Sequence, residues 1–219
     1  MTDIALVTGG GGTLGTMVAQ RLVEQGTHVV LAGRSRANLD ASPLKDVLKF
    51  AGDLSQPDNV EQLFLAILER YDEPPSLLAH CAGSVMVRPM NRITPEQYHS
   101  CVQNNLDSAF FTLQKFVQGL LDEKRPGSAV LVSSVAGRIG ISNHTAVAAA
   151  KAGIEGLVRS AAADYASRGI RINGIAPGLF PSNSTKGFFT GDKAEAQLAA
   201  QYPLGRFGSV DDERNATCW

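Results

Sequence analysis

Five of the seven residues 9–15 are glycines, and they lie between a short apolar run and a segment with helical periodicity. The spacing Gly10-x-Gly12-x-x-Gly15 is typical of the turn that joins a strand to a helix around a dinucleotide. Glycine lets the backbone turn tightly and approach a diphosphate, whose charge then lies at the helix N-terminus. A glycine-rich turn that binds nothing is the alternative. The residues predicted to bind the diphosphate are Gly9, Gly10, Gly12, Thr13, Leu14 and Gly15.

The next strand-like segment, residues 28–33, favours one dinucleotide over the other. An acidic residue at its end would bind the ribose 2′-hydroxyl of NAD(H). This segment has no acid and is followed by Arg34, Ser35 and Arg36. Because a guanidinium matches a phosphate bidentately, Arg34 and Ser35 are predicted to bind an adenosine 2′-phosphate, and NADP(H) is favoured over NAD(H). The alternative is that these arginines only solvate a loop.

The elements that must position these residues alternate along the whole chain. Short apolar runs without polar alternation, as expected of strands covered on both faces, are separated by longer segments of helical periodicity. We therefore predict an α/β protein with a Rossmann-type doubly wound parallel sheet in three αβα layers, as a single domain over residues 1–219. The expected strands are 4–7, 28–32, 47–51, 77–80, 129–133 and 171–175, and the expected helices are 13–25, 56–71, 95–123 and 146–167.

Composition and charge exclude several classes of protein. The 219 residues carry 20 Lys and Arg against 21 Asp and Glu, which leaves no basic footprint for a nucleic acid. Hydrophobic residues make up 44% and charged residues 19%, as in an ordinary globular protein. The three cysteines are widely spaced, so neither a disulfide framework nor a metal site is expected. Residues 1–8 carry an acid and run into a strand-like segment, so no signal peptide is expected, and no run of about 20 apolar residues occurs. We therefore predict a cytoplasmic protein without membrane partners.

Six further motifs, in order along nearly the whole chain, resemble those of the short-chain dehydrogenase/reductase family. They are Gly52-Asp53-Leu54, Cys81-Ala82-Gly83, Asn105-Leu106, Val132-Ser133-Ser134-Val135-Ala136-Gly137, Lys151-Ala152-Gly153 and the segment 171–178. The resemblance implies a nicotinamide coenzyme, with contacts from Asp53, Leu54, Ala82, Gly83, Lys151, Pro177 and Gly178. It implies catalytic roles for Asn105, Ser134 and Lys151. Asn105 and Ser134 could instead be structural remnants that satisfy backbone groups.

One departure from the family pattern affects the chemistry. The family has a Tyr four residues before the Lys, and here that position is Val147. Val147 follows Ser134 at the family's usual interval, so no insertion has displaced the tyrosine. Reduction of a ketone needs a proton, and loss of a positioned general acid typically costs about 10²–10⁴ in rate. Either another group supplies the proton, a different bond is reduced, or the site is silent.

His144 is the candidate for the missing acid. It lies seven residues before Lys151, and in the enoyl-acyl-carrier-protein reductases, a divergent branch of the same family, the active-site Tyr has this spacing. Histidine is the side chain that readily serves as an acid near neutral pH. Ser134 would then donate a hydrogen bond to the developing oxyanion, and Lys151 would hold the ribose. The alternative is that His144 is a loop residue at the entry of a helix.

The remaining expectations concern the periphery of the molecule. Residues 179–200, with Gly187, Phe188, Phe189 and Gly191, are predicted to form a mobile lid over the substrate. Cys81 is expected to be a small buried hydrophobe. The cluster Phe110, Phe111 and Phe116 predicts core or helix-pair packing, and the family resemblance implies a homodimer or homotetramer. By the same resemblance the chain stops at Trp219 inside the last long helix, so we expect the C-terminus to be truncated before a final strand.

Two functions from different classes remain open at this point. The first is an NADP(H)-dependent oxidoreductase that reduces the carbonyl or activated C=C of a small molecule or acyl thioester. The second is a catalytically silent NADP(H)-binding protein with a sensing or scaffold role. Both predict tight coenzyme binding, and turnover separates them. Neither a carboxylate clamp nor a carrier-protein patch in the lid identifies the substrate.

Overall fold

A computed structural model describes residues 2–182, 185–188, 191–200 and 202–217. Its centre is a six-stranded sheet in the order β3-β2-β1-β4-β5-β6, in which every neighbouring pair is parallel. The predicted doubly wound parallel sheet is confirmed. The strands are β1 (Ile4–Thr8), β2 (His28–Gly33), β3 (Leu48–Ala51), β4 (Leu77–His80), β5 (Gly127–Val132) and β6 (Ile170–Ile175).

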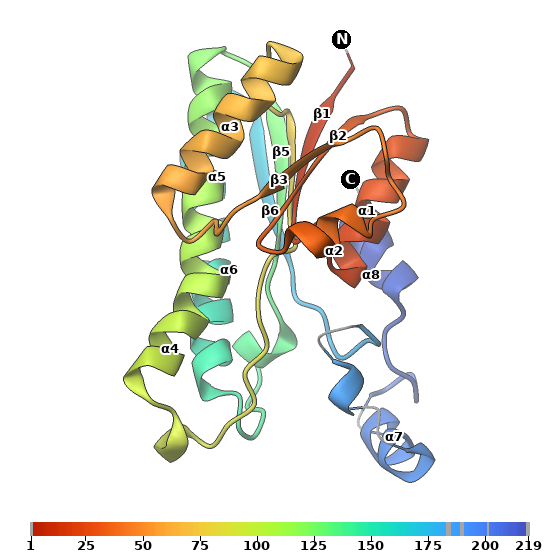
Figure 1. The fold of residues 1–219 in the computed structure, drawn as a ribbon. Helices are drawn as coiled ribbons and strands as arrows, with labels where there is room; N and C mark the ends of the chain where they lie inside the picture. The colour runs from red at the N-terminus through yellow and green to blue at the C-terminus, as the bar shows by residue number, and fades with distance from the viewer. Residues whose placement is uncertain (1, 183–184, 189–190, 201, 218–219) are drawn as a thin grey trace.

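Helices cover both faces of this sheet. Figure 1 shows α3, α4, α5 and α6 on one side of the strands and α1, α2 and α8 on the other. The α-helices are α1 (Thr13–Glu24), α2 (Arg36–Asp40), α3 (Pro57–Tyr71), α4 (Pro95–Val102), α5 (Ser108–Asp122), α6 (Thr145–Tyr165), α7 (Asp192–Ala199) and α8 (Val210–Thr217). Shorter helical turns are η1 (Met90–Arg92), η2 (Gln103–Asp107), η3 (Val135–Gly137), η4 (Ala166–Arg168) and η5 (Lys186–Phe188).

The sequence accounts for most of these elements locally. The central strands are apolar on both faces because each face is packed under helices, and every residue of β1 is buried. The helix α4 begins with a capping box in which Thr94 and Gln97 bind each other's backbone, followed by Pro95 at the first helical position. Two separate hydrophobic cores result, one under α3, α5 and α6 and the other under α1.

Two of the differences between the structure and the sequence prediction lie near the carboxyl edge of the sheet. The short helix α2, capped by the Ser35 side chain, was not predicted, because five residues are too few for a periodic pattern. The helix expected over 95–123 is continuous but contains a π-helical turn, η2, at Gln103–Asp107. Such turns are often found at functional sites, and this one contains the predicted active-site residue Asn105.

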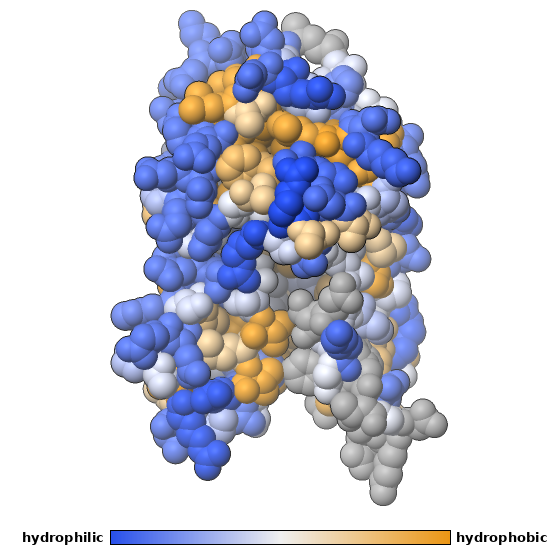
Figure 2. Space-filling model, in the orientation of Figure 1, coloured by the Kyte–Doolittle hydropathy of each residue, from blue (hydrophilic) through white to orange (hydrophobic). Residues whose placement is uncertain are grey.

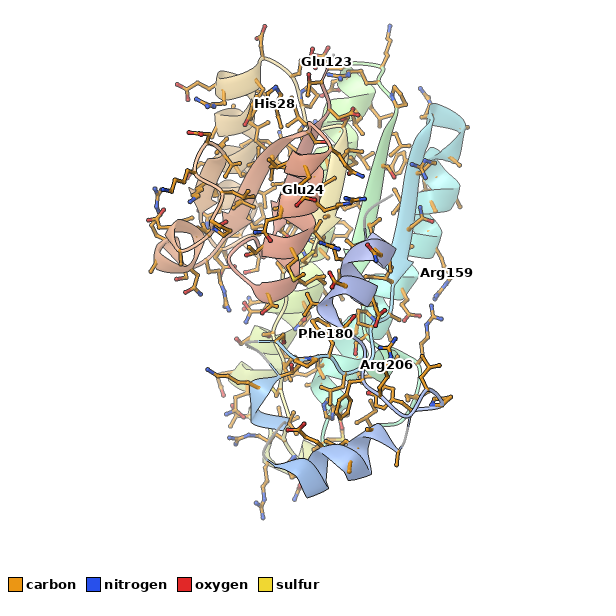
Figure 3. The ribbon with its side chains drawn as sticks, turned by 90° about the vertical axis from the view of Figure 1, so that its right-hand side faces the viewer. Glu24, His28, Glu123, Arg159, Phe180 and Arg206 are labelled. Carbon is orange, nitrogen blue, oxygen red and sulfur yellow. The ribbon has the colours of Figure 1, made fainter. Side chains whose placement is uncertain are left out.

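The ends of the parallel strands define where a ligand can bind. Figure 3 places His28, which begins β2, and Glu123, which follows α5, at one end of the molecule. Phe180 and Arg206 lie at the opposite end, beyond the carboxyl ends of the strands. Ligands of open α/β sheets bind at the carboxyl end, where successive connections leave toward opposite faces. In this sheet that position is between β1 and β4.

Candidate functional site

The glycine segment forms a tight loop at the carboxyl end of β1. Gly9 has φ +64°, a backbone conformation that favours glycine, and its carbonyl oxygen accepts a 2.8 Å hydrogen bond from Gly12 N. A Cβ on Gly15 would lie 2.3 Å from that same oxygen, so no side chain fits there without backbone movement. The residue before α1 is Gly12, which has no side chain to cap the helix. The positive end of the helix dipole therefore faces a loop that a diphosphate can approach closely.

The two arginines after β2 have different partners. Arg36 Nε lies 3.0 Å from Asp40 Oδ2, one helical turn away on α2. Arg34 forms no ion pair with any described residue, and its Nη1 instead donates a 2.7 Å hydrogen bond to Asn104 Oδ1. The Ser35 hydroxyl accepts a hydrogen bond from Asn38 N and caps α2. Of these two exposed arginines, Arg34 is thus the one that has no counterion among the described residues.

Asp53 and Leu54 shape the turn that follows β3. Asp53 Oδ1 accepts a 3.0 Å hydrogen bond from Ser55 N, and the Asp53 carbonyl oxygen accepts one from the Asn59 side chain. Leu54 is buried in the core beneath α3. The Gly52 N–H group donates to Gly33 O, which fixes this turn beside the end of β2. The adenine contact predicted for these two residues stays a prediction.

The end of β4 lies between the glycine loop and the predicted catalytic residues. The Ala82 N–H group donates to Thr8 Oγ1 at 3.2 Å, and a Cβ on Gly9 would lie 2.8 Å from the Cys81 carbonyl carbon. On its other side, a Cβ on Gly83 would lie 2.8 Å from Asn105 Oδ1 and 3.2 Å from Lys151 Nζ. The structure therefore brings together three groups that are far apart in the sequence: Gly83 from the segment after β4, Asn105 from η2 and Lys151 from α6.

Asn105 uses its side-chain amide to hold backbone groups. It is fully buried, donates to Cys101 O at 2.8 Å and to Ser84 O at 3.2 Å, and accepts from Ser84 N. These bonds connect the π-helical turn to the segment after β4. The structural role that the sequence left open for Asn105 is therefore present in the structure, and its catalytic role stays a prediction.

Lys151 points from α6 toward the end of β5. Its Nζ donates a 2.8 Å hydrogen bond to Val132 O, and the side chain is buried. Burial lowers the pKa of Lys151 from 10.5 to about 8, so the ammonium group is still mostly charged at neutral pH. Ser133 Oγ donates to Lys151 O at 2.9 Å and anchors the helix to the strand. The cation is thus held rigidly beside Gly83.

Ser134 and the segment 177–179 complete the carboxyl edge. The half-buried Ser134 accepts a hydrogen bond from Ala136 N on its Oγ, which leaves its own hydroxyl proton to be donated. The Val135 N–H group donates to Pro177 O at 2.9 Å, which fixes this segment beside the serine. Leu179 N donates to the Tyr202 hydroxyl group, whose ring packs against Gly178. The predicted nicotinamide-facing residues Pro177 and Gly178 therefore lie next to Ser134.

Val147 is buried in a small hydrophobic cluster. It packs with Cys101 and Ala146, and with the partly buried Met86 and Ile93. It lies on α6 one turn before Lys151, so the position that would carry the family's tyrosine holds an aliphatic side chain. No proton can come from this residue.

His144 immediately precedes the first residue of α6. Its Nδ1 lies 2.7 Å from the Ser142 carbonyl oxygen. It lies seven positions before Lys151, which corresponds to about 10 Å along the helix axis and to nearly the same face of the helix. The catalytic role of His144 stays a prediction.

His80, the last residue of β4, was not predicted from the sequence as a site residue. It is fully buried, with Nδ1 3.0 Å from Thr8 Oγ1 and Nε2 3.4 Å from Ser108 Oγ. Burial, together with the nearby charge of Lys151, lowers the pKa of His80 from 6.5 to about 3, so it is neutral. The only sequence signal was a histidine at the end of an otherwise apolar strand.

The three phenylalanines of α5 differ in how far they are buried. Phe116 is buried in the core, Phe111 is partly buried against it, and Phe110 is 44% exposed. The predicted lid contains η5 and α7 among its described residues, and Phe189 and Trp219 lie outside them. Across the described part of the chain, no group of three His, Cys, Asp or Glu side chains could hold a metal ion, and no helix could span a bilayer.

The fold and the site together define a dinucleotide-binding protein of the doubly wound α/β class, and comparisons with known proteins identify the family. The family model described as Enoyl-(Acyl carrier protein) reductase matches residues 11–219. The chain is 31% identical to the 3-oxoacyl-acyl-carrier-protein reductase FabG of Escherichia coli (strain K12) over 221 residues, which cover 99% of this chain and 88% of the relative. It is 30% identical to the FabG protein of Staphylococcus aureus (strain Mu50 / ATCC 700699), covering 100% and 90%.

A solved structure agrees with these relatives. Levodione reductase superimposes with a TM-score of 0.90 at 29% identity, over 98% of this chain and 88% of that one. The chain belongs to the short-chain dehydrogenase/reductase family, whose members are oxidoreductases that bind nicotinamide coenzymes. The predicted family resemblance is confirmed.

Proposed function

We propose that this protein is an NADP(H)-dependent reductase that acts on the carbonyl or activated C=C bond of a small molecule or acyl thioester. The observation that carries this proposal is the convergence of Gly83, Asn105 and Lys151 beside Ser134, at the same edge of the sheet as the glycine loop. The matched relatives are reductases, and they give no support to the alternative of a silent nucleotide-binding protein.

The residues at the carboxyl edge fit a nicotinamide dinucleotide. The glycine loop leaves no room for side chains where a diphosphate would lie, and the uncapped N-terminus of α1 favours its charge. Arg34 supplies an unpaired positive charge for a 2′-phosphate, and when bound the reduced coenzyme supplies a hydride. The residues proposed to hold it are Gly9, Gly10, Gly12, Thr13, Leu14, Gly15, Arg34, Ser35, Asp53, Leu54, Ala82, Gly83, Lys151, Pro177 and Gly178.

The remaining requirement is a proton for the reduced substrate. Ser134 retains a hydroxyl proton that can be donated to a developing oxyanion, and the buried ammonium of Lys151 adds positive charge. Val147 cannot supply the proton, so we propose that His144, or a water molecule held near Ser134, does so. A positioned acid of this kind contributes about 10²–10⁴ in rate.

Apolar side chains around this edge favour a substrate with an apolar portion. Five exposed apolar residues lie on the two segments that follow β4 and β5, and Arg88 N joins these segments by a 2.8 Å bond to Asn143 O. Figure 2 shows apolar surface over the segment between β4 and α4. Burying this surface against an acyl chain or hydrocarbon ring would stabilise the complex. The residues are Val85, Val87, Met90, Ile139 and Ile141.

The proposal is tested by NADPH consumption with ketones, quinones, 3-oxoacyl thioesters and enoyl thioesters of increasing chain length. We expect turnover that improves as the acyl chain lengthens. His144→Ala should lower kcat about 10²-fold or more, because the proton donor is lost. His99→Ala is the matched control, since it removes an exposed histidine from α4, outside the site.

Two results would contradict the proposal in different ways. Tight NADPH binding with no turnover across the whole panel would favour the silent nucleotide-binding protein. Turnover that is insensitive to His144→Ala would leave the reductase in place and assign the proton to water. The homodimeric or homotetrameric state and the cytoplasmic location stay predictions.

A further inference from the structure

The hydrogen bond between Arg34 and Asn104 spans the carboxyl edge of the sheet. Arg34 follows β2, whereas Asn104 lies in the π-helical turn η2, 70 residues later in the chain. The turn is tied to the end of β4, because Ser108 Oγ donates to Asn104 O at 3.0 Å and lies 3.4 Å from His80 Nε2. Since β1 lies between β2 and β4, the bond connects the two sides of the crevice where the coenzyme is proposed to bind.

The local structure fixes which way the Asn104 amide points. Its Nδ2 donates to Ser100 Oγ at 3.2 Å, one turn earlier, so its oxygen is the atom that faces Arg34. The neighbouring Asn105 is turned inward and holds Cys101 O and Ser84. The π-helical turn therefore presents one asparagine to the buried site and the next one to the arginine.

The choice of an amide for this contact has an electrostatic consequence. A carboxylate would neutralise the guanidinium, as Asp40 does for Arg36. The amide oxygen of Asn104 orders Arg34 through one N–H group and leaves its positive charge and its other donors for an anion. An ordered guanidinium loses less rotamer freedom when it binds a phosphate.

We propose that Asn104 is a positioning residue for coenzyme selection, which holds Arg34 so that it binds the adenosine 2′-phosphate of NADP(H). This inference rests on the proposed function, because it requires that the crevice binds a nicotinamide dinucleotide. It predicts that Asn104 affects the affinity for phosphorylated coenzymes and not the affinity for their unphosphorylated counterparts.

Calorimetric titration of the full chain tests the proposal without any turnover measurement. Asn104→Ala should lower the affinity for NADPH about tenfold and leave the affinity for NADH unchanged. The variant removes the hydrogen bond that orders Arg34, and only the coenzyme with a 2′-phosphate binds Arg34. Asn104→Asp should weaken NADPH further, since a carboxylate would pair with Arg34 and repel the phosphate. The fragments 2′,5′-ADP and 5′-AMP should show the same contrast.

The controls separate positioning from a general structural role. Gln103→Ala changes an exposed side chain in the same turn and should leave both affinities unchanged. In an Arg34→Ala background, Asn104→Ala should have no further effect on NADPH binding, since the residue acts through the arginine. Thermal unfolding of each variant checks that the fold is retained.

The results that would overturn the role of Asn104 differ from those that would overturn the proposed function. An equal loss for NADPH and NADH, an unchanged NADPH affinity, or an increase for both coenzymes would each overturn the role of Asn104. A wild-type protein that binds neither coenzyme would instead overturn the proposed function itself.

Discussion

Three of the four residues predicted to be catalytic, Asn105, Ser134 and Lys151, differ in how many of their hydrogen-bonding atoms are already in use. Asn105 commits both atoms of its amide group to Cys101 and Ser84. Ser134 accepts one bond and keeps its proton, and Lys151 uses one of its three donors on Val132 O. At the scale of single residues, Ser134 and Lys151 are therefore the groups able to bind a ligand, while Asn105 shapes the site around them.

Replacing Val147 restores the group that the family has at this position. In a His144→Ala background, Val147→Tyr should raise kcat/KM for carbonyl substrates by about 10²–10⁴, because a phenol one turn before Lys151 would supply the missing proton. Val147→Phe is the matched control, since it adds the ring without the hydroxyl group and should give no increase. Steady-state kinetics with a ketone and NADPH measure both. Equal rates for the two variants would mean that the pocket is arranged for other chemistry.

At the scale of elements, the two irregular segments matter most. The glycine loop packs the backbone of Gly9 closely against Gly15 in the first turn of α1. The π-helical turn points two adjacent asparagines at different partners. Regular helices and strands then hold these segments in place. The chemistry therefore depends on the irregular segments, and the rigidity comes from the elements on either side.

The close packing of Gly15 against Gly9 tests whether the glycine loop must have this shape to bind the coenzyme. Gly15→Ala should weaken NADPH binding at least tenfold and destabilise the protein by about 2–4 kcal/mol, because its Cβ would lie 2.3 Å from Gly9 O. Gly140→Ala is the control, since a Cβ there meets no atom within 4 Å. Calorimetry and urea unfolding measure the two effects. Normal coenzyme affinity in Gly15→Ala would show that the close packing of this loop is not required.

At the scale of the whole molecule, His80 joins three elements across the sheet. Thr8 from β1 and Ser108 from α5 contact its two ring nitrogens, and β4 supplies the residue itself. Each ring nitrogen of the neutral imidazole lies within hydrogen-bond distance of one of these hydroxyl groups. The Thr8 hydroxyl oxygen also accepts a hydrogen bond from Ala82 N, which extends this network to the proposed coenzyme site. The same buried histidine therefore links the stability of the sheet to the shape of the site.

This burial makes the protein sensitive to acid. The pKa of His80 is about 3 in the folded protein and ordinarily 6.5, so between these pH values only the unfolded chain takes up the proton. The free energy of unfolding should fall as the pH is lowered from 6.5 toward 3, by up to about 1.4 kcal/mol per pH unit from this residue. In His80→Asn this contribution should vanish, although the variant is less stable at neutral pH.

Urea unfolding at a series of pH values measures the difference between the wild type and this variant. His99→Asn, which removes a surface histidine, should keep the wild-type slope. Parallel pH profiles for the wild type and His80→Asn would show that His80 is not the source of the acid sensitivity.

The amino-acid sequence by itself determined the order and type of most elements, the glycine loop and the family. These features depend on residues close together in the chain, because apolar periodicity and glycine spacing act through local backbone geometry. Ser134, Lys151 and the absence of a tyrosine at Val147 were identified from the resemblance of their motifs to those of the family. The short helix α2 escaped because five residues do not establish a period.

Only the tertiary structure decided which of these residues meet. The bond from Arg34 to Asn104 joins positions 70 residues apart, and the network around His80 joins β1, β4 and α5. The apolar surface around Val85 and Ile141 comes from two segments that follow different strands. Such contacts depend on how the parallel strands are ordered and how the helices pack on them, and no local pattern encodes that order.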